Sequence, residues 1–297
     1  MKNIVRNIFN VLMSFALIFI ILSIMLFNII NDKILNKNYI LSKMEETEFY
    51  LQVSREIKNG FENYIYQSGL PEDTIENIVS DEMIKKDVNG IVDYIYEGKE
   101  ISLSSEDVKN NLDVKIQNYV ATQNLKLNEQ GKNNINEFEK IIVNEYINNV
   151  KISETFYNMC HSMINKVNEQ ISKIENLPFI ALIIVIILMI LINIKELLNV
   201  INFGGISLLS TGILIKLGIN LIMKKVEFDN LVIITNSLSN LIVSIIKENI
   251  YKILDFSNIY IICGIVAIII SAILKNLNVN KENIYKPKRR GIKQKNK

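Results

Sequence analysis

Four long apolar runs divide the chain, and polar sequence separates each run from the next. They cover residues 8–30, 177–194, 204–223 and 259–277. A helix needs about 20 mostly apolar residues to cross the hydrocarbon layer of a bilayer. The pattern therefore predicts four transmembrane helices.

The first run follows Lys2 and Arg6 and carries no small-residue pattern at its far end, as a cleaved signal peptide would. We therefore expect an uncleaved anchor over residues 1–31. The second run carries no charge. The third contains several glycines and Lys216, and sliding it to residues 197–215 would place that lysine at the membrane interface.

The 145 residues between the first two runs, residues 32–176, show helical spacing. Apolar positions recur three or four apart, which gives one apolar face per helix. The series are Tyr50, Val53, Ile57, Phe61 and Tyr64; Ile135, Phe138, Ile142 and Tyr146; and Phe156, Cys160, Met163, Val167, Ile171 and Ile174. The last series leads into the second span, with a break or bend expected at Pro178.

Local signals mark where helices end within this segment. Gly69 is typical of a helix end, Pro71 of a helix start, and Gly98 of a turn. Ser104 followed by Asp107 predicts a capping box, in which the serine side chain would accept from a backbone N–H of the first turn.

The fold class predicted is an all-α integral membrane protein, with four transmembrane helices and a helical extracytoplasmic domain inserted between the first and second. Residues 177–277 form a three-helix transmembrane region, and residues 278–297 a basic cytoplasmic tail. Within that region, residues 228–254 predict an amphipathic helix in the outer loop. It would lie at the interface, pack on the outer domain, or form a fifth span.

Charge is distributed unevenly along the chain. The whole sequence carries +2, whereas residues 32–176 contain 16 basic and 25 acidic residues, a net charge of −9. The last 13 residues carry seven basic groups and no acidic one. Because basic residues beside spans favour the cytoplasm, both termini are predicted inside and residues 32–176 outside. Lys286, Lys288, Arg289 and Arg290 are the candidate topology and lipid-contacting residues.

Residues 68–108, "SGLPEDTIENIVSDEMIKKDVNGIVDYIYEGKEISLSSEDV", resemble a pattern in uncharacterised multi-span membrane proteins of Gram-positive bacteria. Those proteins have an anchor, a helical outer domain and further spans. The resemblance implies a cell-envelope location facing the wall. It implies no activity and no site residues.

No residue pattern indicates catalysis, a cofactor or a metal. The only histidine, His161, adjoins Cys160, but adjacent helix positions point about 100° apart. One histidine excludes motifs that need two. The acidic clusters lack the alternating carboxylates and glycine of oxygen-ligand loops. The two cysteines, Cys160 and Cys263, are expected to be free, and no folded module indicates nucleic-acid binding.

The third span holds the candidate functional residues Lys216, Asn220 and Thr211. A charge inside a membrane is a functional candidate by default. Lys216 lies about seven residues from the expected outer end, so its side chain could instead reach the interface. Small residues on this span predict close packing between other helices.

Two functions follow from these features. The first is a non-enzymatic envelope protein whose outer domain binds a protein, wall polymer or lipid, alone or as a homo-oligomer. The second is a subunit of a transporter or channel, with Lys216 on a polar route. An enzyme acting on lipid or wall material has no motif in its favour.

Overall fold

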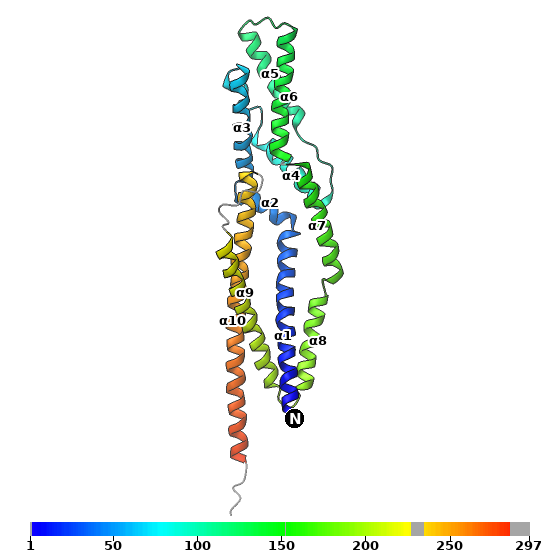
Figure 1. Cartoon of the computed structure of the whole chain (residues 1–297), viewed down its shortest axis with the longest axis vertical. Coiled ribbons are helices and arrows are strands. Elements are labelled where there is room, and N and C mark those ends of the chain that lie inside the picture. The colour runs from blue at the N-terminus through cyan, green and yellow to red at the C-terminus, as the bar shows by residue number, and fades with distance from the viewer. Residues whose placement is uncertain (1, 152, 227–234, 286–297) are drawn as a thin grey trace, which may run out of the picture. The chain divides into compact units, whose positions relative to one another are not determined.

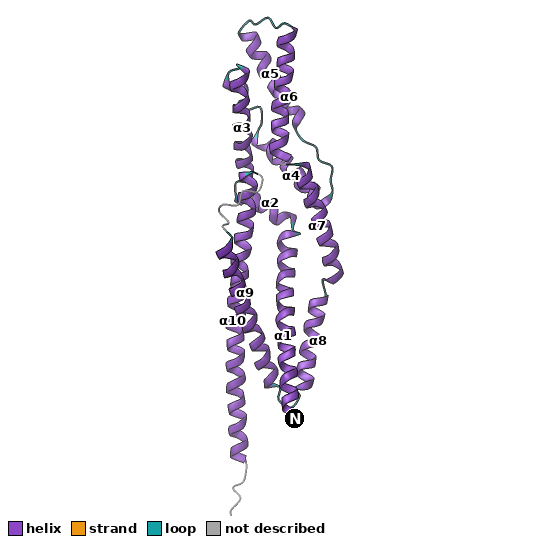
Figure 2. Cartoon of the chain, in the orientation of Figure 1, coloured by secondary structure: helices purple, strands orange, loops and turns teal. Residues whose placement is uncertain are grey.

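The computed structural model describes residues 2–151, 153–226 and 235–285. These residues are helical and include no strand (Figure 2), which confirms the all-α prediction. The chain divides into two compact units, and their helices are labelled in Figure 1. The membrane unit combines Met1–Phe27, Ile174–Val226 and Ile250–Lys297, and the helical unit combines Asn28–Lys173 and Glu227–Asn249.

The membrane unit is built on α1 (Lys2–Ile29), α8 (Leu177–Ile192), α9 (Leu198–Lys225) and α10 (Asn236–Tyr285), the last of which begins in the helical unit. Four helical runs, one through each of these helices, are long and apolar enough to cross a membrane. Large apolar side chains face outward from all four helices, including Phe19, Ile183, Leu221 and Ile262, each more than half exposed. These features suggest a multi-pass membrane protein.

The helix expected at residues 228–254 is not a separate element. Residues 227–234 lie outside the described part, and the rest belongs to α10, a single helix of 50 residues. No glycine or proline interrupts the sequence from Leu254 to Ile259, so nothing ends the helix before the fourth span. Leu238 and Leu241 at its start are buried in the core of the helical unit. Of the described residues of this segment, residues 235–249 belong to the helical unit and residues 250–254 to the membrane unit.

The helical unit begins with a π-helical turn, Ile30–Ile34, followed by α2 (Lys37–Glu46) and α3 (Phe49–Ser68). A short 3₁₀ turn, Glu72–Thr74, precedes α4 (Asp81–Glu97). The hairpin of α5 (Ser105–Thr122) and α6 (Glu129–Lys151) follows, and then α7 (Glu154–Ile174). The helices pack chiefly as α3 on α6, α5 on α6 and α3 on α4.

The predicted helix ends mostly match the structure. Gly69 and Gly98 both adopt the left-handed conformation that glycine tolerates best, and they end α3 and α4. The chain breaks at residues 175–176, between α7 and α8, with Pro178 in the first turn of α8. Pro71, in contrast, starts only the three-residue turn.

The predicted capping box at Ser104 is wrong. Ser104 does occupy the N-cap of α5, but its side chain accepts no hydrogen bond from that helix. Its hydroxyl donates to Asp87 Oδ1 at 2.9 Å, and its backbone N–H donates to Asp87 Oδ2 at 2.7 Å. A hydrogen bond to a charged carboxylate is stronger than one between neutral groups. The contact with Asp87 of α4 therefore determines the orientation of the serine side chain.

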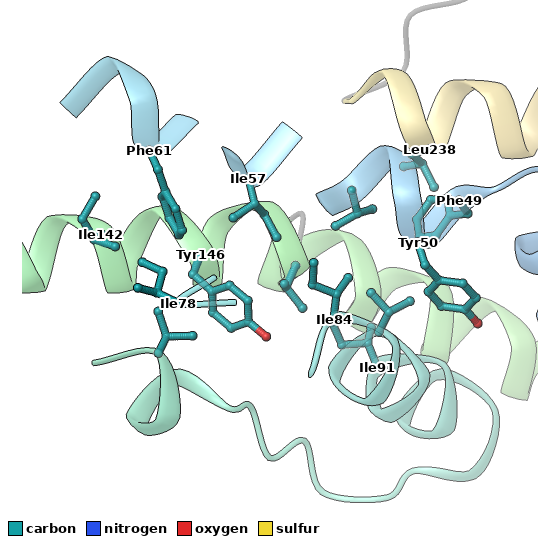
Figure 3. Close-up of a cluster of buried hydrophobic side chains, with 14 of the residues drawn as sticks. Phe49, Tyr50, Ile57, Phe61, Ile78, Ile84, Ile91, Ile142, Tyr146 and Leu238 are labelled. Atoms are coloured by element: carbon teal, nitrogen blue, oxygen red, sulfur yellow. The ribbon is translucent and has the colours of Figure 1, made fainter. Parts of the chain in front are cut away.

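One apolar core holds the helical unit together (Figure 3). Its fully buried side chains come from α3, α4, α5, α6 and the segment before α4. They include four residues of the predicted periodic series, Ile57, Phe61, Ile142 and Tyr146, and five that the series did not contain, Ile65, Ile78, Ile84, Leu112 and Ile116. Burial of apolar area stabilises a fold by roughly 25 cal/mol per Å². The buried side chains of Leu112, Ile116, Ile142 and Tyr146 therefore help to hold α5 and α6 in the core.

Candidate ligand-binding cleft

The predicted intramembrane residues of α9 do not form one group. Lys216 and Asn220 are exposed, and Lys216 Nζ donates to Asn258 Oδ1 of α10 at 3.3 Å. Thr211 is fully buried, and its hydroxyl donates to the Ser207 carbonyl at 2.8 Å. The tail residues Lys286, Lys288, Arg289 and Arg290 lie outside the described residues.

Close packing of α9 through small residues is confirmed. A Cβ atom added at Gly212 would lie 2.7 Å from the Ser257 carbonyl oxygen, and one at Gly264 would lie 2.6 Å from the Leu209 nitrogen. Ser257 Oγ also donates to the Gly212 carbonyl at 2.7 Å. The glycines therefore bring the backbones of α9 and α10 together, which is a packing role.

A buried amide pair joins α1 to the end of α8. Asn10 and Asn193 have no exposed surface, and they exchange two hydrogen bonds, of 3.1 and 2.7 Å. Nearby, Arg6 pairs with Glu196 at 2.8 Å, and Lys275 donates to Asn199 at 2.7 Å. Each amide satisfies the other, so the arrangement fixes these helices and offers no reactive group.

The most distinctive hollow lies in the helical unit, between α5 and α6. It has a volume of about 750 Å³, within the usual range of small-molecule sites. Ile116 and Glu139 are the two buried residues that line it, and together they form its floor. Apolar walls come from Val120, Leu125, Leu127 and Ile135, and the polar rim from Lys109, Asn110, Asp113, Gln117, Asn124, Lys132 and Asn136. We call this hollow the α5–α6 cleft.

Glu139 is the unusual side chain of this cleft. Only 4% of its surface is exposed. Within the described part of the chain, its carboxylate makes no hydrogen bond or ion pair. Neither of its oxygens is among the fully buried, unpartnered side-chain atoms of the described residues, so the carboxylate reaches the open space of the cleft although the rest of the side chain is buried. Glu139 therefore leaves an acceptor available at the floor of the cleft.

The electrostatic surroundings agree with this interpretation. Burial raises the pKa of Glu139, the nearby Asp113 carboxylate raises it further, and Lys109 opposes both effects. Asp113 projects from the facing helix and accepts a hydrogen bond from Gln117 at 2.7 Å. The cleft is thus lined by one carboxylate from each helix, Asp113 at the rim on α5 and Glu139 at the floor on α6.

A buried network in the helical unit connects α4, α5 and α6. Besides its two bonds from Ser104, the Asp87 carboxylate accepts a hydrogen bond from the Tyr146 hydroxyl at 2.6 Å. Asp87 and Tyr146 have no exposed surface. The network leaves Asp87 fully occupied, so it holds the helices that form the cleft and is not itself a site.

The pair Cys160 and His161 is not arranged for nucleophilic chemistry. His161 Nδ1 lies 3.0 Å from the Ile95 carbonyl oxygen, and its Nε2 lies 3.0 Å from the Asn165 side-chain nitrogen. Both ring nitrogens are therefore occupied. Burial raises the pKa of the Cys160 thiol, which disfavours the reactive thiolate.

Sequence reasoning missed Glu139, although a signal for it was present. It lies four residues after Ile135 and three before Ile142, on the apolar stripe of its helix. A carboxylate on such a stripe is either paired in the core or directed into a cavity. The pairing of Asn10 with Asn193 had no comparable signal, because the two residues lie 183 positions apart.

Comparison with known proteins adds no relative, since no family model, curated protein or solved structure matches this chain.

Proposed function

We propose that this chain is a non-enzymatic membrane protein of the cell envelope, whose helical unit binds a ligand in the α5–α6 cleft. The observation that carries the proposal is the cleft itself, with the buried and unpaired Glu139 at its floor. The site is built on two helices fixed by a packed core, so its geometry exists before any ligand arrives.

Charge and hydropathy support placing this unit outside the membrane and both termini in the cytoplasm. Residues 32–176 are acidic overall, and basic residues flank the first and last spans. The four candidate spans would anchor the binding unit to the bilayer. This topology is part of the proposal, as is the Gram-positive envelope implied by residues 68–108.

The test is recovery of a bound molecule from native membranes. Ala121→Trp places a bulky side chain in the cleft wall. Val114→Trp is the matched control, because Val114 lies on the same helix, is 56% exposed and does not line the cleft. A molecule that copurifies with the wild-type protein and Val114→Trp, and is lost from Ala121→Trp, supports the function. Equal recovery from all three proteins contradicts it.

The alternative, a subunit of a transporter or channel, rests on Lys216. Lys216 and Asn258 are both exposed polar residues on apolar helices, and a second copy of the chain could cover them. Lys216→Leu separates the two functions. Loss of ion or solute flux in reconstituted vesicles, together with loss of assembly, would favour the alternative. Unchanged flux and assembly would count against it.

A further inference from the structure

We propose that the α5–α6 cleft binds an organic ammonium group attached to an apolar body, with the ammonium on Glu139. This inference rests on the proposed binding function and specifies its ligand. It follows from three properties of the cleft: the unpaired carboxylate, the position of the second carboxylate, and the apolar walls.

The unpaired carboxylate determines the sign of the ligand. An ionised Glu139 needs a donor, and the surrounding protein supplies none among the described residues. An alcohol could donate one hydrogen bond without charge. An ammonium group donates up to three and also neutralises the charge, and hydrogen bonds between charged partners are about twice as strong as neutral ones.

Asp113 strengthens the same preference. It lines the cleft from α5, opposite Glu139 on α6, and interacts unfavourably with the Glu139 charge. A cation between the two carboxylates would relieve this repulsion, whereas an anionic group would add to it. Lys109 and Lys132 are exposed at the rim, where water screens their charges.

The walls determine the rest of the ligand. Ile116, Val120 and Ile135 line the cleft, and Leu125 and Leu127 join them from the loop between the helices. Leu125 is 48% exposed and Leu127 is 37% exposed, so both have apolar surface for a ligand to cover. A small inorganic cation would leave this surface in water. An amine with an aliphatic or aromatic body would use both features.

Three probes of one shape test the inference on the full chain in bilayer discs of zwitterionic lipid. They are phenethylammonium, neutral 2-phenylethanol and anionic 3-phenylpropionate, titrated by saturation-transfer difference NMR. Phenethylammonium is expected to bind most tightly to the wild-type protein. This comparison requires no substitution, so it remains decisive if a variant fails to fold.

Two variants then locate the binding. Glu139→Gln is expected to weaken phenethylammonium binding at least about tenfold, since it replaces a charge-assisted hydrogen bond by a neutral one. Glu137→Gln removes the same charge from an exposed position on the same helix that does not line the cleft, and is expected to leave affinity unchanged.

Equal affinity of the wild-type protein and Glu139→Gln for phenethylammonium would overturn the inference, as would no saturable binding of that probe. Equal or tighter binding of 2-phenylethanol or 3-phenylpropionate would also overturn it. If either of these bound and Ala121→Trp abolished the binding, only the ligand class would fall, and the proposed binding function would stand.

Discussion

Tyr146→Phe tests whether the buried network around Asp87 holds the cleft helices in place. The substitution removes one hydroxyl, which donates to Asp87 Oδ2 at 2.6 Å, and leaves the aromatic ring and its packing intact. Burial raises the pKa of Tyr146, and the bond to Asp87 raises it further, so the hydroxyl remains a donor at neutral pH.

The expected cost follows from the charge on the acceptor. A hydrogen bond to a charged group contributes about 1.5–3 kcal/mol to stability. Asp87 keeps its two bonds from Ser104, so its carboxylate is not left wholly unpaired. We therefore expect a loss of about 2 kcal/mol in the free energy of opening, which is about a 30-fold increase in the opening equilibrium constant.

Hydrogen exchange measured by mass spectrometry, on the full chain in bilayer discs, gives this free energy for peptides from α4, α5 and α6. Tyr119→Phe is the matched control, since Tyr119 lies on α5, is half-buried and makes no side-chain hydrogen bond within the described residues. If Tyr146→Phe changed exchange no more than Tyr119→Phe, the network would not stabilise these helices, and the reasoning would be refuted.

Two further predictions concern α10 and Glu139. Gly264→Val should separate α9 from α10, because a Cβ atom at this position would lie 2.6 Å from the Leu209 backbone nitrogen. Gly218→Val is the control, because a Cβ atom there meets no atom within 4 Å. Resistance to protease in micelles should fall only for Gly264→Val. Because the raised pKa of Glu139 makes the folded state bind its proton more tightly, stability is greatest below the ordinary pKa of glutamate and falls as pH rises through the raised value. In chemical denaturation, Glu139→Gln should therefore be more stable than the wild-type protein at pH 8 and equally stable at pH 4. A variant less stable than the wild-type protein at pH 8 would contradict the inference that burial raises the pKa of Glu139.

Much of the architecture could be predicted from local sequence because its signals are local. Apolar runs of about 20 residues mark the four candidate spans. The positive φ angles of Gly69 and Gly98 reflect a conformation that glycine reaches without strain. The same periodicity that marks Phe138, Ile142 and Tyr146 as a helix face also places them in the core.

The remaining features depend on contacts between distant residues. Ser104 has the sequence of a helix cap, but a buried carboxylate 17 positions earlier binds it instead. The cleft arises where α5 and α6 pack, so no single segment encodes it. Lys216 and Asn220 stood out for their polarity in an apolar run, yet both side chains are exposed on α9. These features depend on which residues the fold brings into contact, and the composition of a single segment does not reveal those contacts.

The central claim is that the helical unit lies outside the cell and both ends of the chain lie inside. In a background where Cys160 and Cys263 are replaced by serine, Glu129→Cys places a thiol at an exposed position at the start of α6. Lys288→Cys places one in the tail. A membrane-impermeant maleimide added to intact cells should label Glu129→Cys at once, and Lys288→Cys only after the cells are permeabilised. Labelling of Lys288→Cys on intact cells, or protection of Glu129→Cys, would contradict the account.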